Sequence, residues 1–242
     1  MQTSFKNQYP LLEICAYSIA DCLAAQRGGA VRVELCAGRP EGGTTPSYGA
    51  IIGARRYLDI TLHVMIRPRG GHFIYSPQEL QVMIDDIRLA RQCGVDGIVI
   101  GCLTADGNVD KKACRCLIKE AGKLSVTFHR AFDECRNPER ALEDIIALGC
   151  QRLLTSGQSP TAQEGIPLLR KLATQTIDVD GHSRIIIMPG SGINPGNIVE
   201  IAQQTGAQEF HTSARAKPDG NTDAAVVTHC IRKLASVKRN NK

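Results

Sequence analysis

The sequence has no tryptophan, and aromatic residues make up only 4% of its 242 residues. Proteins that bind nucleic acid generally combine a basic surface with aromatic side chains on which bases stack. No basic stripe with interleaved aromatics occurs here. Part of the net charge of +5 comes from the basic stretch 238–242, which a solvated tail explains. The composition therefore predicts no nucleic-acid partner.

Long apolar runs are also missing. No segment approaches the roughly 20 consecutive apolar residues that a membrane-spanning helix needs. The opening residues, MQTSFKNQYP, lack the apolar stretch of a signal peptide. We therefore expect no membrane partner and a cytoplasmic location.

Cysteine is abundant, but the paired spacings that would give it a standard role are absent. The chain has 10 cysteines and no Cys-x-x-Cys pair, so the sequence signatures of zinc ribbons and thioredoxin-like proteins do not occur. Most of the cysteines lie within apolar strand or helix patterns. In a reducing cytosol we expect them to be small buried thiols.

What the sequence does contain is a repeated alternation of short apolar strands and helices. The helix over 76–94 has the clearest boundaries: Ser76 is an N-cap, Pro77 the first helical residue, Glu79 the capping-box partner, and Gly94 ends the helix. Eight such strand–helix units follow one another without a linker. This predicts a single α/β domain, because a closed (β/α)8 TIM barrel typically takes ~250 residues. An open doubly wound sheet is the alternative, since sequence alone does not give strand order.

The predicted barrel covers residues 11–236. Residues 1–10 are assigned to an N-terminal tail and residues 237–242 to a basic C-terminal tail.

A weak internal repeat predicts which strand residues face the barrel interior. Gly29, Gly94, Gly149 and Gly206 each lead into an even-numbered strand, and the residues four and six positions later are nearly all apolar. These should face the helices, so the residues five and seven positions later should face inward. Similar alternation applies to the odd strands. The interior at the strand ends is then expected to hold Glu13, Glu34, Arg67, His129, Ser156, His211 and Ser213, with Cys15, Cys36 and Met65 nearby.

An anion-binding turn is predicted after the seventh strand. The apolar strand 185–188 leads into Gly190-Ser191-Gly192, where a ligand can approach the backbone closely, and Asn194-Pro195 then fits the start of a helix. Together with Ser213 after the eighth strand, this turn lies where barrels commonly bind phosphate. The alternative is a tight turn without a ligand.

The interior residues suggest two competing functions. In an enzyme acting on a phosphorylated or otherwise anionic small molecule, Glu13, Glu34 or His129 would act as acid or base and Arg67 would hold the substrate. In a metal site, Cys15, Cys36, Met65 and the histidines are donors suited to Cu(I). A purely structural network, in which Glu13 or Glu34 pairs with Arg67, is a third explanation.

Eight motifs along the chain resemble the CutC copper-homeostasis family. They are LLEIC at 11–15, GGAVRVELC at 28–36, EGGTTPS at 41–47, MIRPRGG at 65–71, VTFHRAFD at 126–133, LTSG at 154–157, MPGSGI at 188–193 and EFHTSAR at 209–215. The resemblance implies a TIM barrel, a cytoplasmic homodimer and a role in copper homeostasis with copper-ion binding. It implies copper ligands at Cys15 and Cys36. Ser191 stands where some members have glycine.

The motifs contain more than a copper carrier requires. A Cu(I) carrier needs two or three soft ligands, whereas these motifs also include acids, an arginine, histidines and a glycine turn. Our hypothesis from the sequence is that any copper binding is secondary to an activity on a phosphorylated or otherwise anionic metabolite.

Overall fold

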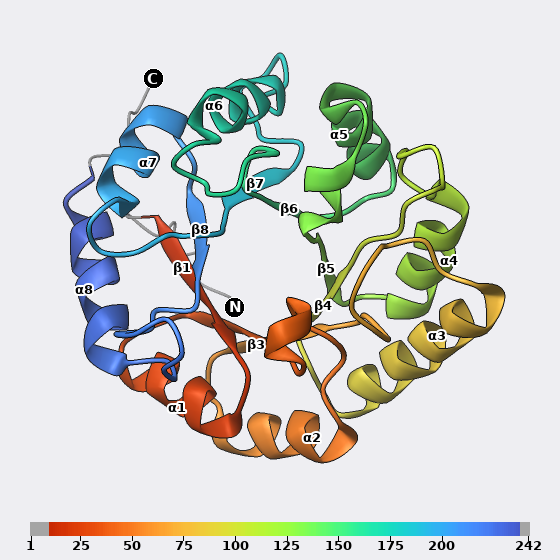
Figure 1. The fold of residues 1–242 in the computed structure, drawn as a ribbon, viewed down its shortest axis with the longest axis horizontal. Coiled ribbons are helices and arrows are strands. Elements are labelled where there is room, and N and C mark those ends of the chain that lie inside the picture. The colour runs from red at the N-terminus through yellow and green to blue at the C-terminus, as the bar shows by residue number, and fades with distance from the viewer. Residues whose placement is uncertain (1–9, 238–242) are drawn as a thin grey trace.

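The computed structural model describes residues 10–237. Within them, eight parallel strands form one sheet in the order β7-β6-β5-β4-β3-β2-β1-β8. The sheet curls into a nearly closed barrel with eight helices around it (Figure 1). The barrel prediction is confirmed, and the doubly wound alternative is wrong, because consecutive strands are neighbours and β8 pairs with β1. Of the predicted tails, 1–10 and 237–242, residues 1–9 and 238–242 lie outside the described residues.

The strands are short and all of them run parallel. They are β1 (Leu11–Ala16), β2 (Arg32–Leu35), β3 (Thr61–Met65), β4 (Gly97–Ile100), β5 (Ser125–Phe128), β6 (Arg152–Thr155), β7 (Ile186–Pro189) and β8 (Glu209–Thr212). No ladder pairs β7 with β8 within residues 10–237, so the barrel has a seam there. The Thr212 hydroxyl donates to the carbonyl of Ile193 across this seam at 2.6 Å.

The helices begin where the sequence offers a cap in most cases. They are α1 (Ile19–Arg27), α2 (Tyr48–Tyr57), α3 (Pro77–Gln92), α4 (Lys111–Ala121), α5 (Pro138–Ala147), α6 (Ile166–Gln175), α7 (Ile198–Thr205) and α8 (Ala224–Ala235), with short 3-10 helices η1 (Arg39–Glu41) and η2 (Arg130–Glu134). The predicted capping box of Ser76 and Glu79 is present at α3. In the described part of the chain, no helix is both long and apolar enough to cross a membrane.

Two of the strands that lead into the site motifs are short. β5 ends at Phe128 and β8 ends at Thr212. The residues beyond these ends are polar or belong to loops, and they turn over the mouth of the barrel instead of extending the sheet.

The predicted helix start at Asn194 and Pro195 was wrong, because α7 begins at Ile198. Asn194 and Asn197 hold an intervening turn: the Asn194 side chain accepts from the Gly196 N–H at 2.8 Å, and the Asn197 side chain accepts from the Asn194 N–H at 2.9 Å. These local asparagine bonds compete with the first helical turn. The glycine turn and the helix N-terminus are therefore separated by one turn of chain.

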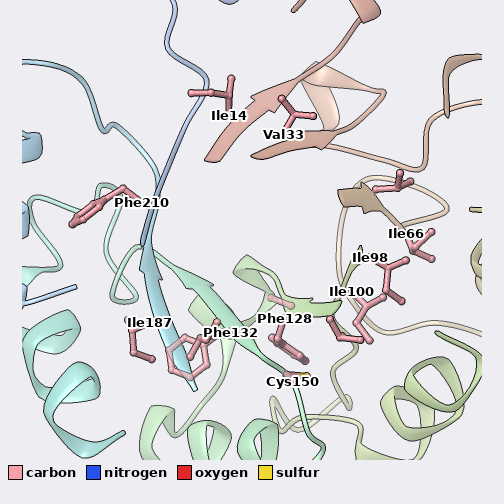
Figure 2. Close-up of a cluster of buried hydrophobic side chains, with 14 of the residues drawn as sticks. Ile14, Val33, Ile66, Ile98, Ile100, Phe128, Phe132, Cys150, Ile187 and Phe210 are labelled. Atoms are coloured by element: carbon pink, nitrogen blue, oxygen red, sulfur yellow. The ribbon is translucent and has the colours of Figure 1, made fainter. Parts of the chain in front are cut away.

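The two faces of the barrel sheet carry separate apolar clusters. Figure 2 shows the larger one, to which alternate strand residues such as Ile14, Ile98 and Phe210 contribute fully buried side chains. Burying each such side chain contributes about 1.5–3 kcal/mol. A one-residue slip would move this whole set to the opposite face. The predicted alternation is confirmed by the smaller, interior cluster of Cys15, Cys36, Met65 and Val99.

Two glycines of the β4 region make room for interior histidines. A Cβ atom added at Gly97 would lie 2.5 Å from the ring of His63. A Cβ atom at Gly101 would lie 2.4 Å from Cε1 of His129. Larger residues are therefore excluded from these two positions, because the rings of His63 and His129 occupy the space.

We expect Gly101→Ala to destabilise the protein by about 1–3 kcal/mol, since the added methyl group overlaps the buried His129 ring. Gly49→Ala in α2 is the control: nothing lies within 4 Å of its added Cβ, and alanine favours a helix. Chemical denaturation of both variants tests this. Equal free energies of unfolding for the two variants would contradict it.

Candidate functional site

A cavity of about 610 Å³ opens at the C-terminal ends of the strands. Its volume lies in the range that small-molecule sites occupy. Most of the residues predicted from the sequence line it, namely Cys15, Glu34, Arg67, His129, Ser191, Gly192, His211 and Ser213. Met65 lines it too, whereas four other predicted residues, Glu13, Cys36, Ser156 and Gly190, do not reach its surface.

A buried ionic network lies beneath the cavity. Arg32 donates through Nε to Glu13 at 2.5 Å and through Nη2 to Glu209. Arg152 donates through Nε to the same Glu209 carboxylate at 2.7 Å. Burial would raise the pKa of Glu13, but the Arg32 charge and a hydrogen bond from His211 outweigh burial and hold that pKa well below its usual value. Glu13 is therefore an ionised structural partner rather than a free acid or base.

The sequence analysis missed the other members of this network. Arg32, Arg152 and Glu209 each stand three positions after a repeat glycine, two positions before the interior residues that the analysis assigned. They share the inward face of the strands with those residues, so extending the repeat by two positions toward the N-terminus would have found them. The ion pair that the sequence suggested between Arg67 and Glu13 or Glu34 does not form within the described residues.

His211 joins this network to the cavity. Its Nδ1 lies 2.8 Å from Oε1 of Glu13, and its Nε2 lies 3.7 Å from Oε2 of Glu34. Burial would lower the pKa of His211, but the facing acids and a hydrogen bond with Cys15 outweigh burial and raise that pKa well above its usual value. The ionised Glu13 carboxylate therefore favours a positive charge on His211 at the cavity wall even where Glu34 is protonated.

Two thiols lie side by side next to His211. Sγ of Cys15 is 4.0 Å from Sγ of Cys36, and both cysteines are free. The contact with Cys36 lowers the pKa of Cys15 well below its usual value, although burial opposes this shift. The same contact, together with burial, raises the pKa of Cys36 well above its usual value. Of the two thiols, Cys15 is therefore the one that loses its proton more readily.

Glu34 lies against this pair as a neutral acid. Its Oε2 atom is 3.4 Å from Sγ of Cys36. Burial raises the pKa of Glu34 to about 8. At neutral pH the group is mainly protonated, so it can donate a proton to a neighbour.

Arg67 occupies the opposite part of the cavity and is held by backbone carbonyls. Its Nη1 donates to the carbonyls of Glu41 and Gly43 at 2.7 and 3.0 Å, and its Nη2 donates to Gly71 at 2.7 Å. These bonds tie the loop after β2 to the loop after β3. Three of its five N–H groups therefore hold loops in place, and Nε is buried without a partner among the described residues.

His129 caps η2. Its Nδ1 accepts the backbone N–H of Ala131 at 3.1 Å, and Nε2 has no partner within the described residues. Burial, reinforced by the charge of Arg67, lowers the pKa of His129 to about 3. The ring is therefore neutral and acts as a donor, which does not suit the general-base role suggested by sequence.

The predicted glycine turn borders the cavity with strained backbone. Ser191 has φ = 80° and Gly192 has φ = 72°, and serine rarely adopts this left-handed region. Ser191 is fixed there because its hydroxyl donates to the carbonyl of Pro160 at 2.9 Å. The N–H groups of Gly192, Ile193 and Ser213 donate to no acceptor among residues 10–237. Gly190 instead donates to Thr155 within the sheet at 3.0 Å.

The loop after β6 is organised by an acid that the sequence analysis did not single out. Asp133 accepts from the hydroxyls of Thr155 and Ser156, the latter at 2.9 Å, and from the backbone N–H of Gln158 at 3.1 Å. Arg130 pairs with the same carboxylate at 2.8 Å. Ser156, predicted to face the barrel mouth, is therefore buried as part of this loop anchor.

The sequence profile of the CutC family matches residues 10–216. A CutC family protein from Bacteroides thetaiotaomicron is 61% identical over 204 residues, covering 84% of this chain and 80% of the relative. A human relative named copper homeostasis protein cutC homolog is 48% identical over 209 residues, covering 86% of this chain and 75% of the relative.

Solved structures agree with this. The crystal structure of a CutC protein from Streptococcus agalactiae matches with a TM-score of 0.79 and 36% identity, over 84% of this chain and 98% of that one. Phosphoribosylanthranilate isomerase from Pyrococcus furiosus matches with a TM-score of 0.62 and 14% identity, over 95% of this chain and 100% of that one. The second likeness shows the fold alone.

The raised pKa of Glu34 predicts a pH dependence of stability. The folded protein holds this proton more tightly than the unfolded chain, so the associated stabilisation is complete below pH 4.5 and is lost as pH rises through about 8. Glu34→Gln keeps the neutral shape and removes the titration. Its free energy of unfolding should therefore rise relative to wild type across this window, by an amount on the order of a few kcal/mol. Denaturation curves at several pH values measure it; parallel pH profiles would contradict the assignment.

Proposed function

The chain belongs to the CutC family, and from this premise we propose that it binds Cu(I) through Cys15 and Cys36 as part of copper homeostasis. The observation that carries the proposal is the 4.0 Å separation of the two sulfur atoms. Thiolates are the protein ligands that favour Cu(I). Each cysteine lies on or directly after a different strand, so the barrel holds the pair in place without any local sequence motif.

The two thiols fit a soft metal ion as they stand. A thiolate–zinc bond is about 2.3 Å long, so two sulfurs 4.0 Å apart can reach one ion of comparable size without backbone movement. Both cysteines bind the ion as thiolates, and Cys15, whose pKa is lowered, loses its proton more readily than Cys36, whose pKa is raised. Glu34 has an oxygen within 4.8 Å of both sulfurs and offers a further donor.

Surroundings and access also support copper binding here. Met65 belongs to the same interior cluster as both cysteines and brings a thioether. Cys15 lines the cavity whereas Cys36 lies behind it. An incoming ion therefore meets Cys15 first, and Cys36 completes the pair.

We also propose the setting in which this occurs. Family membership supports a cytoplasmic homodimer, and the composition supports a protein without nucleic-acid or membrane partners. Free thiols are the form that a reducing compartment maintains.

An anaerobic Cu(I) competition titration against a chromogenic chelator tests the copper proposal. The reduced wild type should bind one equivalent tightly, and Cys15→Ser with Cys36→Ser should lose that equivalent because hydroxyl groups are poor ligands for Cu(I). Cys116→Ser is the control, since Cys116 is exposed on α4 and far in sequence from the pair. Weak binding that all three proteins share would refute the proposal.

A further inference from the structure

Two buried side chains that line the cavity carry hydrogen-bond donors without acceptors. Nε of Arg67 and Nε2 of His129 have no partner within residues 10–237. The residues are only 6% and 3% exposed. An unsatisfied buried polar group costs about 1–3 kcal/mol, and such a group in a native protein calls for an explanation, such as a water, an ion or a functional partner. Both residues line the cavity described above.

Hydrogen bonding fixes the chemical character of His129. Its Nδ1 accepts from a backbone N–H, which can only donate, so Nδ1 carries no proton. The neutral ring must therefore carry its proton on Nε2. This leaves an N–H group that can pair only with an acceptor.

Arg67 brings a positive charge to the same wall. All of its hydrogen-bond partners within the described residues are backbone carbonyls, and none is a carboxylate. A buried charge without a counterion is unfavourable. The free Nε–H group can therefore pair with an added acceptor, and an acceptor with negative charge would also balance the charge of Arg67.

The Phe73 ring packs against both Arg67 and His129. The guanidinium carbon of Arg67 lies 4.7 Å from the centroid of the Phe73 ring. The His129 ring lies 4.9 Å from the same ring, centroid to centroid. Gly101 keeps side-chain atoms out of the space that His129 occupies. The donors are thus positioned by rigid packing before any ligand binds.

We propose that the wall formed by Arg67, Phe73 and His129 binds an oxyanion, the carboxylate or phosphate group of a small metabolite, through Nε of Arg67 and Nε2 of His129. This subsite is separate from the two thiols and goes beyond the proposed copper function. Both donors suit the acceptor oxygens of such a group, and the Arg67 charge suits its negative charge.

The rest of the cavity accommodates such a ligand. Its volume of about 610 Å³ suits a small metabolite. The unpartnered N–H groups of Gly192, Ile193 and Ser213 border the same space and offer further donors to an anion. Four acids also line the cavity, namely Glu34, Glu41, Asp133 and Glu134. Of these, Asp133 is paired with Arg130, and burial raises the pKa of Glu34 to about 8.

Histidine-detected NMR on uniformly 15N-labelled protein tests the subsite with two probes, inorganic phosphate and acetate. Before addition, the His129 spectrum should show the neutral tautomer protonated at Nε2. A saturable shift of its Nε2–H signal supports the proposal, with phosphate alone identifying a phosphate subsite and acetate alone a carboxylate subsite. No saturable shift with either probe at high millimolar concentration would overturn it.

Two variants sharpen this test. His129→Asn keeps an oxygen able to accept the Ala131 N–H at the η2 N-cap but removes the Nε2–H donor, so probe affinity should fall by roughly tenfold or more. Cys15→Ser is the matched control and should leave probe affinity unchanged, which separates this subsite from the copper site. Equal affinity in wild type and His129→Asn, measured by calorimetry, would overturn the proposal even if a shift were seen.

Discussion

The ionic network of Arg32, Glu13 and Glu209 is the constraint on which the site depends. The Glu13 carboxylate lies inside the barrel, where an unpaired charge would be strongly unfavourable. Ion pairs with Arg32 and with His211 balance this charge. His211 is fixed by this contact and in turn faces Glu34. The chemistry of the thiols therefore depends on a pair of charges that never reaches the cavity surface.

The network also connects strands that the sheet does not join. Arg152 on β6 and Glu209 on β8 form an ion pair across the position of β7. No ladder closes β7 to β8 within residues 10–237. Side-chain contacts, including the Thr212 hydrogen bond to Ile193, therefore hold this part of the barrel together where backbone pairing does not.

The sequence predicted those features that repeat or that act locally. The glycine-anchored repeat was enough to separate interior from exterior strand residues, and Ser76 with Glu79 was enough to place a helix start. The function of Arg67 could not be found in this way, because two of its carbonyl partners, on Glu41 and Gly43, lie in a different loop, 26 and 24 residues away. The same is true of His129, whose donor character depends on one bond to Ala131 and on burial. The start of α7 was predicted too early, because Asn194 and Asn197 form a turn whose sequence resembles a helix N-cap.

The seam between β7 and β8 has a consequence for access to the cavity. Gly192 and Ser213 lie in the loops on its two sides, so these loops can move apart without breaking any backbone ladder. The main loss would be the Thr212 hydrogen bond to Ile193. Elsewhere around the ring, separating neighbouring strands would break several backbone hydrogen bonds, each of which contributes to rigidity. Backbone pairing therefore holds neighbouring strands together everywhere around the entrance except between β7 and β8. A ligand too large for the entrance would enter most easily by separating the loops after these two strands.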